Sequence, residues 1–169
     1  VEKDYIKMKD YYMMAIELND GGAMNNLALY YQDVEKDDVK MKEYYLMAID
    51  MNNDNAMYNL GFYYKTIEKD YDKMKDYYMM AIELNNDNAM RNLGWYYQNV
   101  EKDYTKMKKY YLMAIELNNS NAMFNLGYYY QYVEKDYDKM KEYYMMAIEL
   151  YNGGETNNLG SHYQYVEKN

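Results

Sequence analysis

Apolar residues recur along the chain at helical spacing, in a longer and a shorter pattern that alternate. In the longer pattern, over residues 70–84, they fall at i, i+4, i+7 and i+8, and the residues are Met74, Tyr78, Ala81 and Ile82. Asp70 precedes the pattern and can cap a helix, because its carboxylate accepts hydrogen bonds from free backbone N–H groups. Asn85 follows it and suits the left-handed position that ends a helix. The pattern predicts an amphipathic helix with one buried face.

The shorter pattern, over residues 56–64, predicts a second helix. Its shared face carries Ala56, Leu60, Gly61 and Tyr64. A mid-helix glycine costs about 1 kcal/mol relative to alanine, so Gly61 indicates a position where two helices approach closely. The connections at residues 65–69 and 85–88 are short, as antiparallel neighbouring helices require.

These two patterns form a unit that repeats along the whole chain. A Val/Ile-Glu-Lys segment opens each copy and starts every 33 residues, at Val1, Val34, Ile67, Val100, Val133 and Val166, and an aspartate follows it in all copies but the last, which has Asn169. A fixed period of this size is typical of stacked repeats, in which one unit cannot bury its apolar face alone. We therefore expect an all-α fold and a single repeat array over residues 1–169. Its expected elements are a lone helix at 4–18, hairpins at 23–51, 56–84, 89–117 and 122–150, and a final short helix at 156–164.

The composition argues against two kinds of partner, nucleic acids and membranes. The formal net charge of −9 argues against nucleic-acid binding, which needs clustered Lys and Arg, and favours a basic or neutral partner. No apolar run approaches the roughly 18 residues of a membrane span, so we expect no membrane partner. No signal peptide is visible, and we expect an intracellular location, in the cytoplasm of the host or source cell.

The sequence contains few residues that could support catalysis. The chain has no cysteine and one histidine, His162, at a position held by tyrosine in the other copies. Acids such as Glu68 and Asp70 recur in every unit, which marks them as connector and cap residues. Asn53, Asp54 and Asn55 lack the glycine and terminal glutamate of a calcium loop. We expect no enzyme activity, no catalytic residues, no cofactor and no metal.

The unit resembles the Sel-one-like repeat, a branch of the tetratricopeptide superfamily. The motif is Ala-x-x-x-Leu-Gly-x-x-Tyr followed by Asp-x-x-Lys and Tyr-Tyr-x-x-Ala, and here it reads Ala56, Leu60, Gly61, Tyr64, Asp70, Lys73, Tyr77, Tyr78 and Ala81. The resemblance implies an α/α solenoid with a right-handed superhelix, whose concave groove is lined by one face of the first helix of each repeat. Met74 and Ile82 depart from the family, which has alanine there. The composition is also similar to that of repeat arrays encoded by giant DNA viruses of amoebae, which would make this a viral protein.

Most positions are constant between copies, but two sets on the short helix vary, and so does a third set four residues later. The first is Asn25, Tyr58, Arg91, Phe124 and Asn157, the second Leu29, Phe62, Trp95, Tyr128 and Ser161, and the third Asp33, Thr66, Asn99, Tyr132 and Tyr165. Spacings of four place all three on one helix face, which the resemblance assigns to the groove. Tyr, Trp and Arg are typical of binding hot spots. The predicted groove residues are Tyr58, Phe62, Arg91, Trp95, Asn99, Phe124, Tyr128 and Tyr132.

The sequence is consistent with two functions. The first is a non-catalytic protein–protein interaction scaffold that binds a peptide or helix in the groove. The alternative is a structural protein that self-associates, with arrays stacking end to end or side by side through exposed Tyr and Met.

Overall fold

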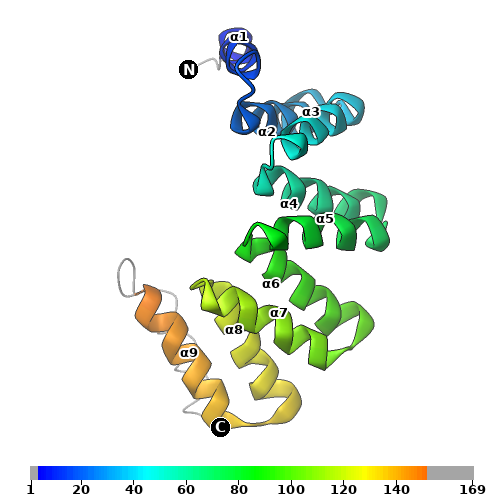
Figure 1. The fold of residues 1–169 in the computed structure, drawn as a ribbon. Helices are drawn as coiled ribbons and strands as arrows, with labels where there is room; N and C mark the ends of the chain where they lie inside the picture. Colours follow the sequence, from blue (N-terminus) through cyan, green and yellow to red (C-terminus); the bar gives the residue numbers. More distant parts are fainter. Residues whose placement is uncertain (1–3, 152–169) are drawn as a thin grey trace. The chain divides into compact units, whose positions relative to one another are not determined.

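The computed structural model describes residues 4–151, and all regular structure in this range is helical (Figure 1). The long helices are α1 (Tyr5–Ile16), α3 (Asp38–Asp50), α5 (Tyr71–Glu83), α7 (Tyr104–Glu116) and α9 (Tyr137–Tyr151). The short helices are α2 (Gly21–Tyr30), α4 (Asp54–Tyr63), α6 (Asp87–Tyr96) and α8 (Ser120–Tyr129). The all-α helix-turn-helix repeat fold is therefore confirmed. The predicted final helix at 156–164 lies outside the described residues.

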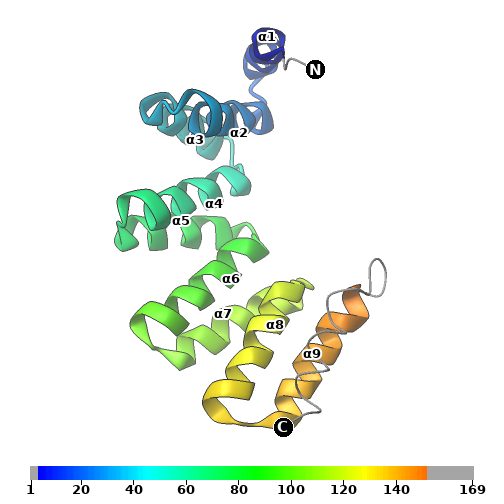
Figure 2. The same cartoon turned by 180° about the vertical axis from the view of Figure 1, so that it is seen from behind.

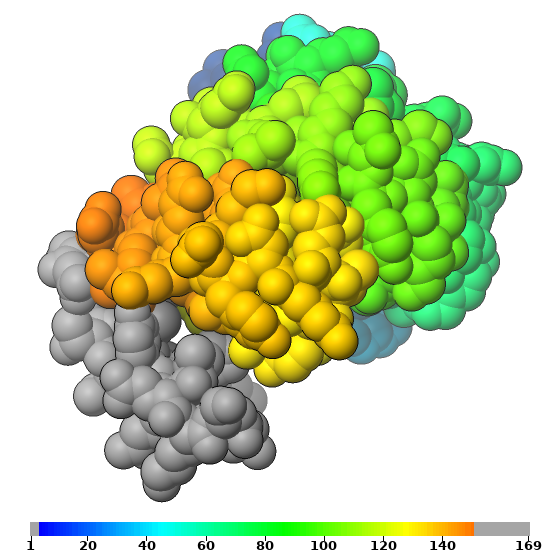
Figure 3. Space-filling view, turned by 90° about the horizontal axis from the view of Figure 1, so that it is seen from below, coloured from blue at the N-terminus to red at the C-terminus, as the bar shows by residue number. Residues whose placement is uncertain are grey.

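The chain divides into two compact units, with the boundary inside α6 between Ala89 and Met90. In the first unit α2 packs against α3 and α4 against α5, and both views show α4 and α5 side by side (Figure 1 and Figure 2). In the second unit α8 packs against α7 and α9, and α8 and α9 (yellow and orange) form a closely packed surface (Figure 3). Each unit is thus built from antiparallel hairpins of one short and one long helix.

The ends of the long helices follow from local sequence. The Asp70 carboxylate accepts a hydrogen bond of 3.0 Å from the backbone N–H of Lys73, so the predicted cap is confirmed. At the other end Asn85 has a left-handed backbone with φ of 62°, also as predicted. The next N–H, of Asn86, donates to the carbonyl of Ala81 at 3.0 Å. This pairing uses carbonyl groups that the end of a helix otherwise leaves unbonded.

Each short helix continues into a π-helical turn, where the sequence predicts a connector. These turns are η1 (Tyr31–Glu35), η2 (Tyr64–Glu68), η3 (Tyr97–Glu101) and η4 (Tyr130–Glu134). In η2 the turn ends at Lys69, whose φ is 58°, and the Asp70 N–H donates to the Tyr64 carbonyl at 3.0 Å. The turn stacks Tyr64 on Tyr77 of α5, with ring centroids 5.5 Å apart and planes 2° from parallel. The same stacked pair occurs in the other hairpins, as Tyr31–Tyr44, Tyr97–Tyr110 and Tyr130–Tyr143.

The core matches the apolar pattern, and it explains the glycine in the short helix. Met74 and Tyr78 have no solvent exposure. A Cβ atom added to Gly61 would lie 2.7 Å from Cδ1 of Tyr78, and one added to Gly94 would lie 2.6 Å from Cδ1 of Tyr111. The close approach predicted at the glycine is present, but the neighbour is a tyrosine ring rather than a second helix backbone.

Candidate binding face

The variable positions of the short helices differ in exposure, and this separates the first set from the second. In the first set the side chains of Tyr58, Arg91 and Phe124 are half-buried. In the second set, one helical turn later, Phe62 and Trp95 are each 39% exposed and Tyr128 is 51% exposed. Of these two sets, therefore, the second offers the larger accessible aromatic surface.

The first set packs on the tyrosine at the centre of each hairpin. The ring of Tyr58 stacks on Tyr78 with centroids 5.8 Å apart and planes at 16°. The ring of Phe124 lies 5.0 Å from that of Tyr144. Each of these two rings packs against the same tyrosine that lies against the glycine of its own short helix. Their main role is therefore to pack within the hairpin.

Arg91 occupies the same position but carries a charge into it. It lies beside buried Tyr111, whose hydroxyl donates to the side-chain carbonyl of Gln98 at 2.8 Å. Burial raises the pKa of Tyr111, and the positive charge of Arg91 partly opposes that shift. Within the described chain the buried Nε of Arg91 has no hydrogen-bond acceptor. A buried N–H without an acceptor costs stability, so Arg91 is a poor packing residue compared with the rings in the other copies.

Exposed aromatic groups gather in the second unit. The side-chain N–H₂ of Asn99 donates to the backbone carbonyl of Trp95, one helical turn earlier, at 3.0 Å. The rings of Tyr128 and Tyr132, one turn apart, lie 4.5 Å from each other at 44°, and Tyr132 is 54% exposed. We refer to Trp95, Asn99, Tyr128 and Tyr132 as the aromatic face. Its side chains are uncharged.

The first unit contributes a smaller aromatic cluster. Phe62 lies 6.2 Å from Tyr58, measured between ring centroids, and the Lys65 ammonium group is 6.0 Å from the Phe62 ring. The structure thus brings Tyr58 next to Phe62, Asn99 next to Trp95, and Tyr128 next to Tyr132. One groove running through both units stays a prediction.

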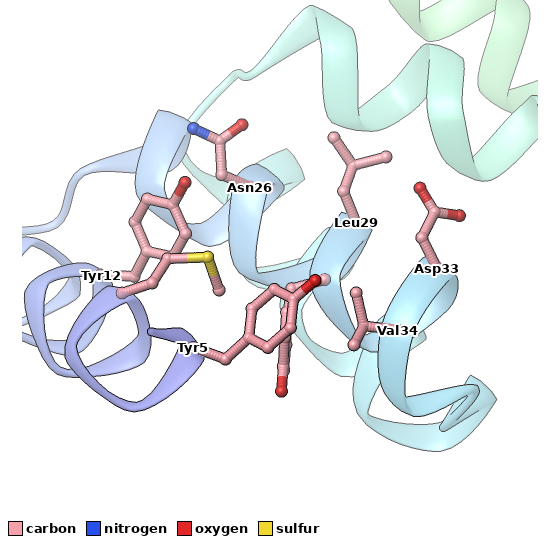
Figure 4. Close-up of a pocket in the computed structure, with 8 residues that line it drawn as sticks. Tyr5, Tyr12, Asn26, Leu29, Asp33 and Val34 are labelled. Carbon is pink, nitrogen blue, oxygen red and sulfur yellow. The ribbon is translucent and has the colours of Figure 1, made fainter. Parts of the chain in front are cut away.

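An open pocket of about 410 Å³ lies at the first repeat, between α1 and α2 with η1 (Figure 4). Tyr5 and Tyr12 of α1 face Leu29 of α2 and Asp33 of η1 across it. No side chain of α1 is buried, and Tyr12 is only half-buried although its equivalent Tyr45 is fully buried. The apolar pattern did not predict this pocket. The available signal was Leu29, an aliphatic residue at the position where the next three copies have the rings of Phe62, Trp95 and Tyr128.

A charged cluster joins the helices beside this pocket. The Glu35 carboxylate accepts hydrogen bonds from the Lys9 ammonium group at 2.8 Å and from the Tyr30 hydroxyl at 2.9 Å. These bonds, that from Lys9 first, lower the pKa of Glu35, and burial is the main cause of the raised pKa of Tyr30. The same arrangement links Lys108, Glu134 and Tyr129 in the second unit. Its repetition indicates a joint between successive repeats rather than a reactive site.

Other kinds of site find no support in residues 4–151. This part of the chain contains no group of three or more His, Cys, Asp or Glu residues placed to hold a metal ion. None of its helices is long and apolar enough to cross a membrane. His162 and Ser161, and the last members of the three variable sets, lie outside the described residues.

Comparison with solved structures supports the repeat assignment. A Sel1 repeat protein from Oxalobacter formigenes aligns with a TM-score of 0.68 and 28% identity, over 79% of this chain and 59% of that one. An immunity protein from Pseudomonas aeruginosa aligns with a TM-score of 0.66 and 26% identity, over 89% of this chain and 59% of that one. A protective antigen of uropathogenic Escherichia coli, described as having an SLR fold, gives a TM-score of 0.73 at 23% identity, over 98% of this chain and 38% of that one.

These likenesses show a Sel1-like repeat fold, and the chain spans less than two-thirds of the length of each of these proteins. No protein-family model matches the chain, and the search of curated proteins gave no match.

Proposed function

We propose that this protein is a non-catalytic interaction scaffold and that its aromatic face binds a peptide or helix of a partner protein. The proposal rests on one observation. At the variable positions of the second unit, Trp95, Tyr128 and Tyr132 leave between 39% and 54% of their surface exposed. The core-facing positions of the same short helices, by contrast, are constant between copies and are buried.

Exposed aromatic residues are costly to a protein that does not use them. An apolar surface in water favours non-specific association, and a solvent-exposed position that drifts freely would acquire Lys, Glu, Ser or Asn. Tyr and Trp instead give a ligand large contact areas while losing little conformational entropy. The aromatic face therefore has the composition of a binding surface.

Charge and fold support the same function. The net charge of −9 favours a partner segment that is basic or neutral. Arg91, one helical turn before Trp95, could pair with a single carboxylate on that segment. The likeness to Sel1-repeat structures supports an interaction scaffold, since one repeat stacked on the next creates an extended surface.

The proposal is tested with peptides selected against the immobilised protein from a random phage-displayed library. Trp95→Ala should weaken the selected peptides by about 2 kcal/mol, the usual size for a hot spot, or roughly 30-fold in Kd. Tyr137→Ala is the matched control, because Tyr137 is 61% exposed in the same unit but lies on the long helix α9. It should change Kd by less than about threefold, within the roughly 0.5 kcal/mol of an ordinary surface change.

The single tryptophan gives a second measurement. Because Trp95 is 39% exposed, its fluorescence in the free protein should be that of a partly hydrated indole and should shift to shorter wavelength when a peptide binds. Equal losses in the Trp95 and Tyr137 variants, or binding without any change in tryptophan emission, would contradict the proposal.

A further inference from the structure

Arg91 is the only arginine in the chain, and it lies on α6 one helical turn before the exposed ring of Trp95. Its side chain is half-buried. Within residues 4–151 the guanidinium group forms no ion pair, and its buried Nε has no hydrogen-bond acceptor. A partly buried charge without a counter-ion lowers stability. Arg91 therefore destabilises the free protein relative to an apolar side chain at the same position.

The tyrosine beside Arg91 cannot act as its counter-ion. Burial raises the pKa of Tyr111, so its hydroxyl stays protonated at neutral pH. That hydroxyl donates a hydrogen bond to Gln98 at 2.8 Å and accepts one from the side chain of Asn125. Neither Gln98 nor Asn125 carries a charge. These three groups bond to one another, and the positive charge of Arg91 has no counter-ion in the described part of the chain.

The first repeat shows what an uncharged residue does at the position of Arg91. There Asn25 accepts a hydrogen bond of 3.0 Å from the side-chain N–H₂ of Asn59, which is equivalent to Asn125. Arginine has no acceptor atom, so Arg91 cannot make this bond, and Asn125 bonds to Tyr111. The position that links two short helices in the first unit thus presents an unpaired positive charge in the second.

We propose that Arg91 makes the aromatic face selective for partner segments that carry a carboxylate, either an Asp or Glu side chain or the terminal carboxyl group. This inference rests on the proposed function, in which Trp95 binds the apolar part of the segment. A guanidinium group offers two parallel N–H donors that match the two oxygens of a carboxylate. A phosphate group is instead bound by clusters of arginine, and this chain has one arginine.

The position of the carboxylate on the segment follows from the helix. Side chains four residues apart lie about 6 Å from each other, so the carboxylate should lie at about that distance from the apolar group that covers Trp95. The net charge of −9 disfavours a segment with several acids. We therefore expect one acid at a fixed position, opposite Arg91, in a segment that is otherwise basic or neutral.

The test begins with a random peptide library displayed with free carboxyl termini. It is selected on the wild-type protein and, in parallel, on Arg91→Phe, which copies the ring of Phe124 and removes the unpaired N–H. Circular dichroism verifies that the variant is folded. Peptides from the wild-type selection should share one carboxylate at a fixed distance from an aromatic or aliphatic residue. Peptides from the Arg91→Phe selection should lack this common feature.

Dissociation constants then measure the contribution of the carboxylate. Each selected peptide is also synthesised with Asn or Gln in place of its acid, and separately with an amidated terminus, which identifies the source of the carboxylate. Loss of this charged hydrogen bond should raise the Kd of the wild-type protein about tenfold or more. The same loss should change the Kd of Arg91→Phe, or of Arg91→Asn, by less than about threefold.

A matched control removes a positive charge elsewhere in the same unit. Lys109 is exposed on α7, and Lys109→Gln lowers the net charge by the same amount as Arg91→Phe. This variant should retain the roughly tenfold preference for the carboxylate form. An equal loss of preference in both variants would show that net charge, and not Arg91, selects the peptides.

The remaining outcomes separate this inference from the proposed function. Peptides that need Trp95 but show the same carboxylate preference on wild type and Arg91→Phe would overturn the selectivity and leave the aromatic face as a binding surface. Equal binding of the acid and amide forms to the wild-type protein would do the same. If the selected peptides are not weakened by Trp95→Ala, the proposed function fails and this inference fails with it.

Discussion

Replacing Gly94 by alanine tests whether the core tyrosine, rather than helix propensity, decides this position. Alanine favours a helix by about 1 kcal/mol over glycine, so propensity alone predicts a more stable protein. The added Cβ, however, would lie 2.6 Å from Cδ1 and 2.8 Å from Cε1 of Tyr111. The ring would have to recede by roughly 0.8 Å to reach an ordinary contact of 3.4 Å. Tyr111 is fully buried and its hydroxyl bonds to Gln98 at 2.8 Å, so that movement strains both packing and a hydrogen bond.

Overpacking of this kind costs about 1–3 kcal/mol, and the gain in propensity offsets about 1 kcal/mol of it. We expect Gly94→Ala to lower the free energy of unfolding by up to about 2 kcal/mol, and Gly94→Val by more, since valine adds volume and has a lower helix propensity. Urea unfolding followed by circular dichroism measures both. The chain supplies a matched control, because the first repeat has Ala28 at this position opposite Tyr45. Ala28→Gly should cost about 2 kcal/mol, the propensity difference plus the loss of a buried methyl group. Stabilisation by Gly94→Ala would show instead that the ring yields without cost and that propensity decides the position.

Three further perturbations follow from the contacts. Arg91→Phe should maintain or raise the thermal unfolding temperature, because it removes the buried Nε–H and copies the ring found at Phe124; a loss above about 1 kcal/mol would show that Arg91 contributes more than packing. Asn53→Ala should cost about 1 kcal/mol in urea unfolding and Asn53→Asp much less, since Asp20 caps the equivalent helix α2 in the same way; equal losses would rule out the cap as the cause. Acid should destabilise the fold, because the backbone N–H three residues on lowers the pKa of Asp103 from 3.8 and the Lys108 ammonium lowers that of Glu134 from 4.5. A carboxylate with a lowered folded-state pKa stabilises the fold above its unfolded pKa, and this stabilisation disappears as the pH falls through the folded value. Calorimetry should therefore show constant stability above about pH 5 and a decline below about pH 4.5, and a decline that began above about pH 6 would need another titrating group.

The repeat and its helices could be predicted because they depend on short-range rules. A 33-residue period with apolar residues at helical spacing indicates stacked helices whatever the partner surface. The cap at Asp70 and the left-handed Asn85 depend on backbone groups within one helical turn, so local sequence suffices to locate them. Neither requires knowledge of a neighbouring helix.

The π-helical turns and the exposure of the variable positions could not be predicted, since both depend on contacts between helices. The turn at Tyr64 is accompanied by a stacked contact with Tyr77, which the chain brings there only when the hairpin closes. Spacings of four put Arg91 and Trp95 on one face, as the sequence indicated, but they could not show that Tyr111 lies under the first and leaves the second 39% exposed. Periodicity specifies the direction of a side chain on its own helix. Whether that direction meets solvent or a ring depends on where the next helix lies, and only the tertiary structure decides that.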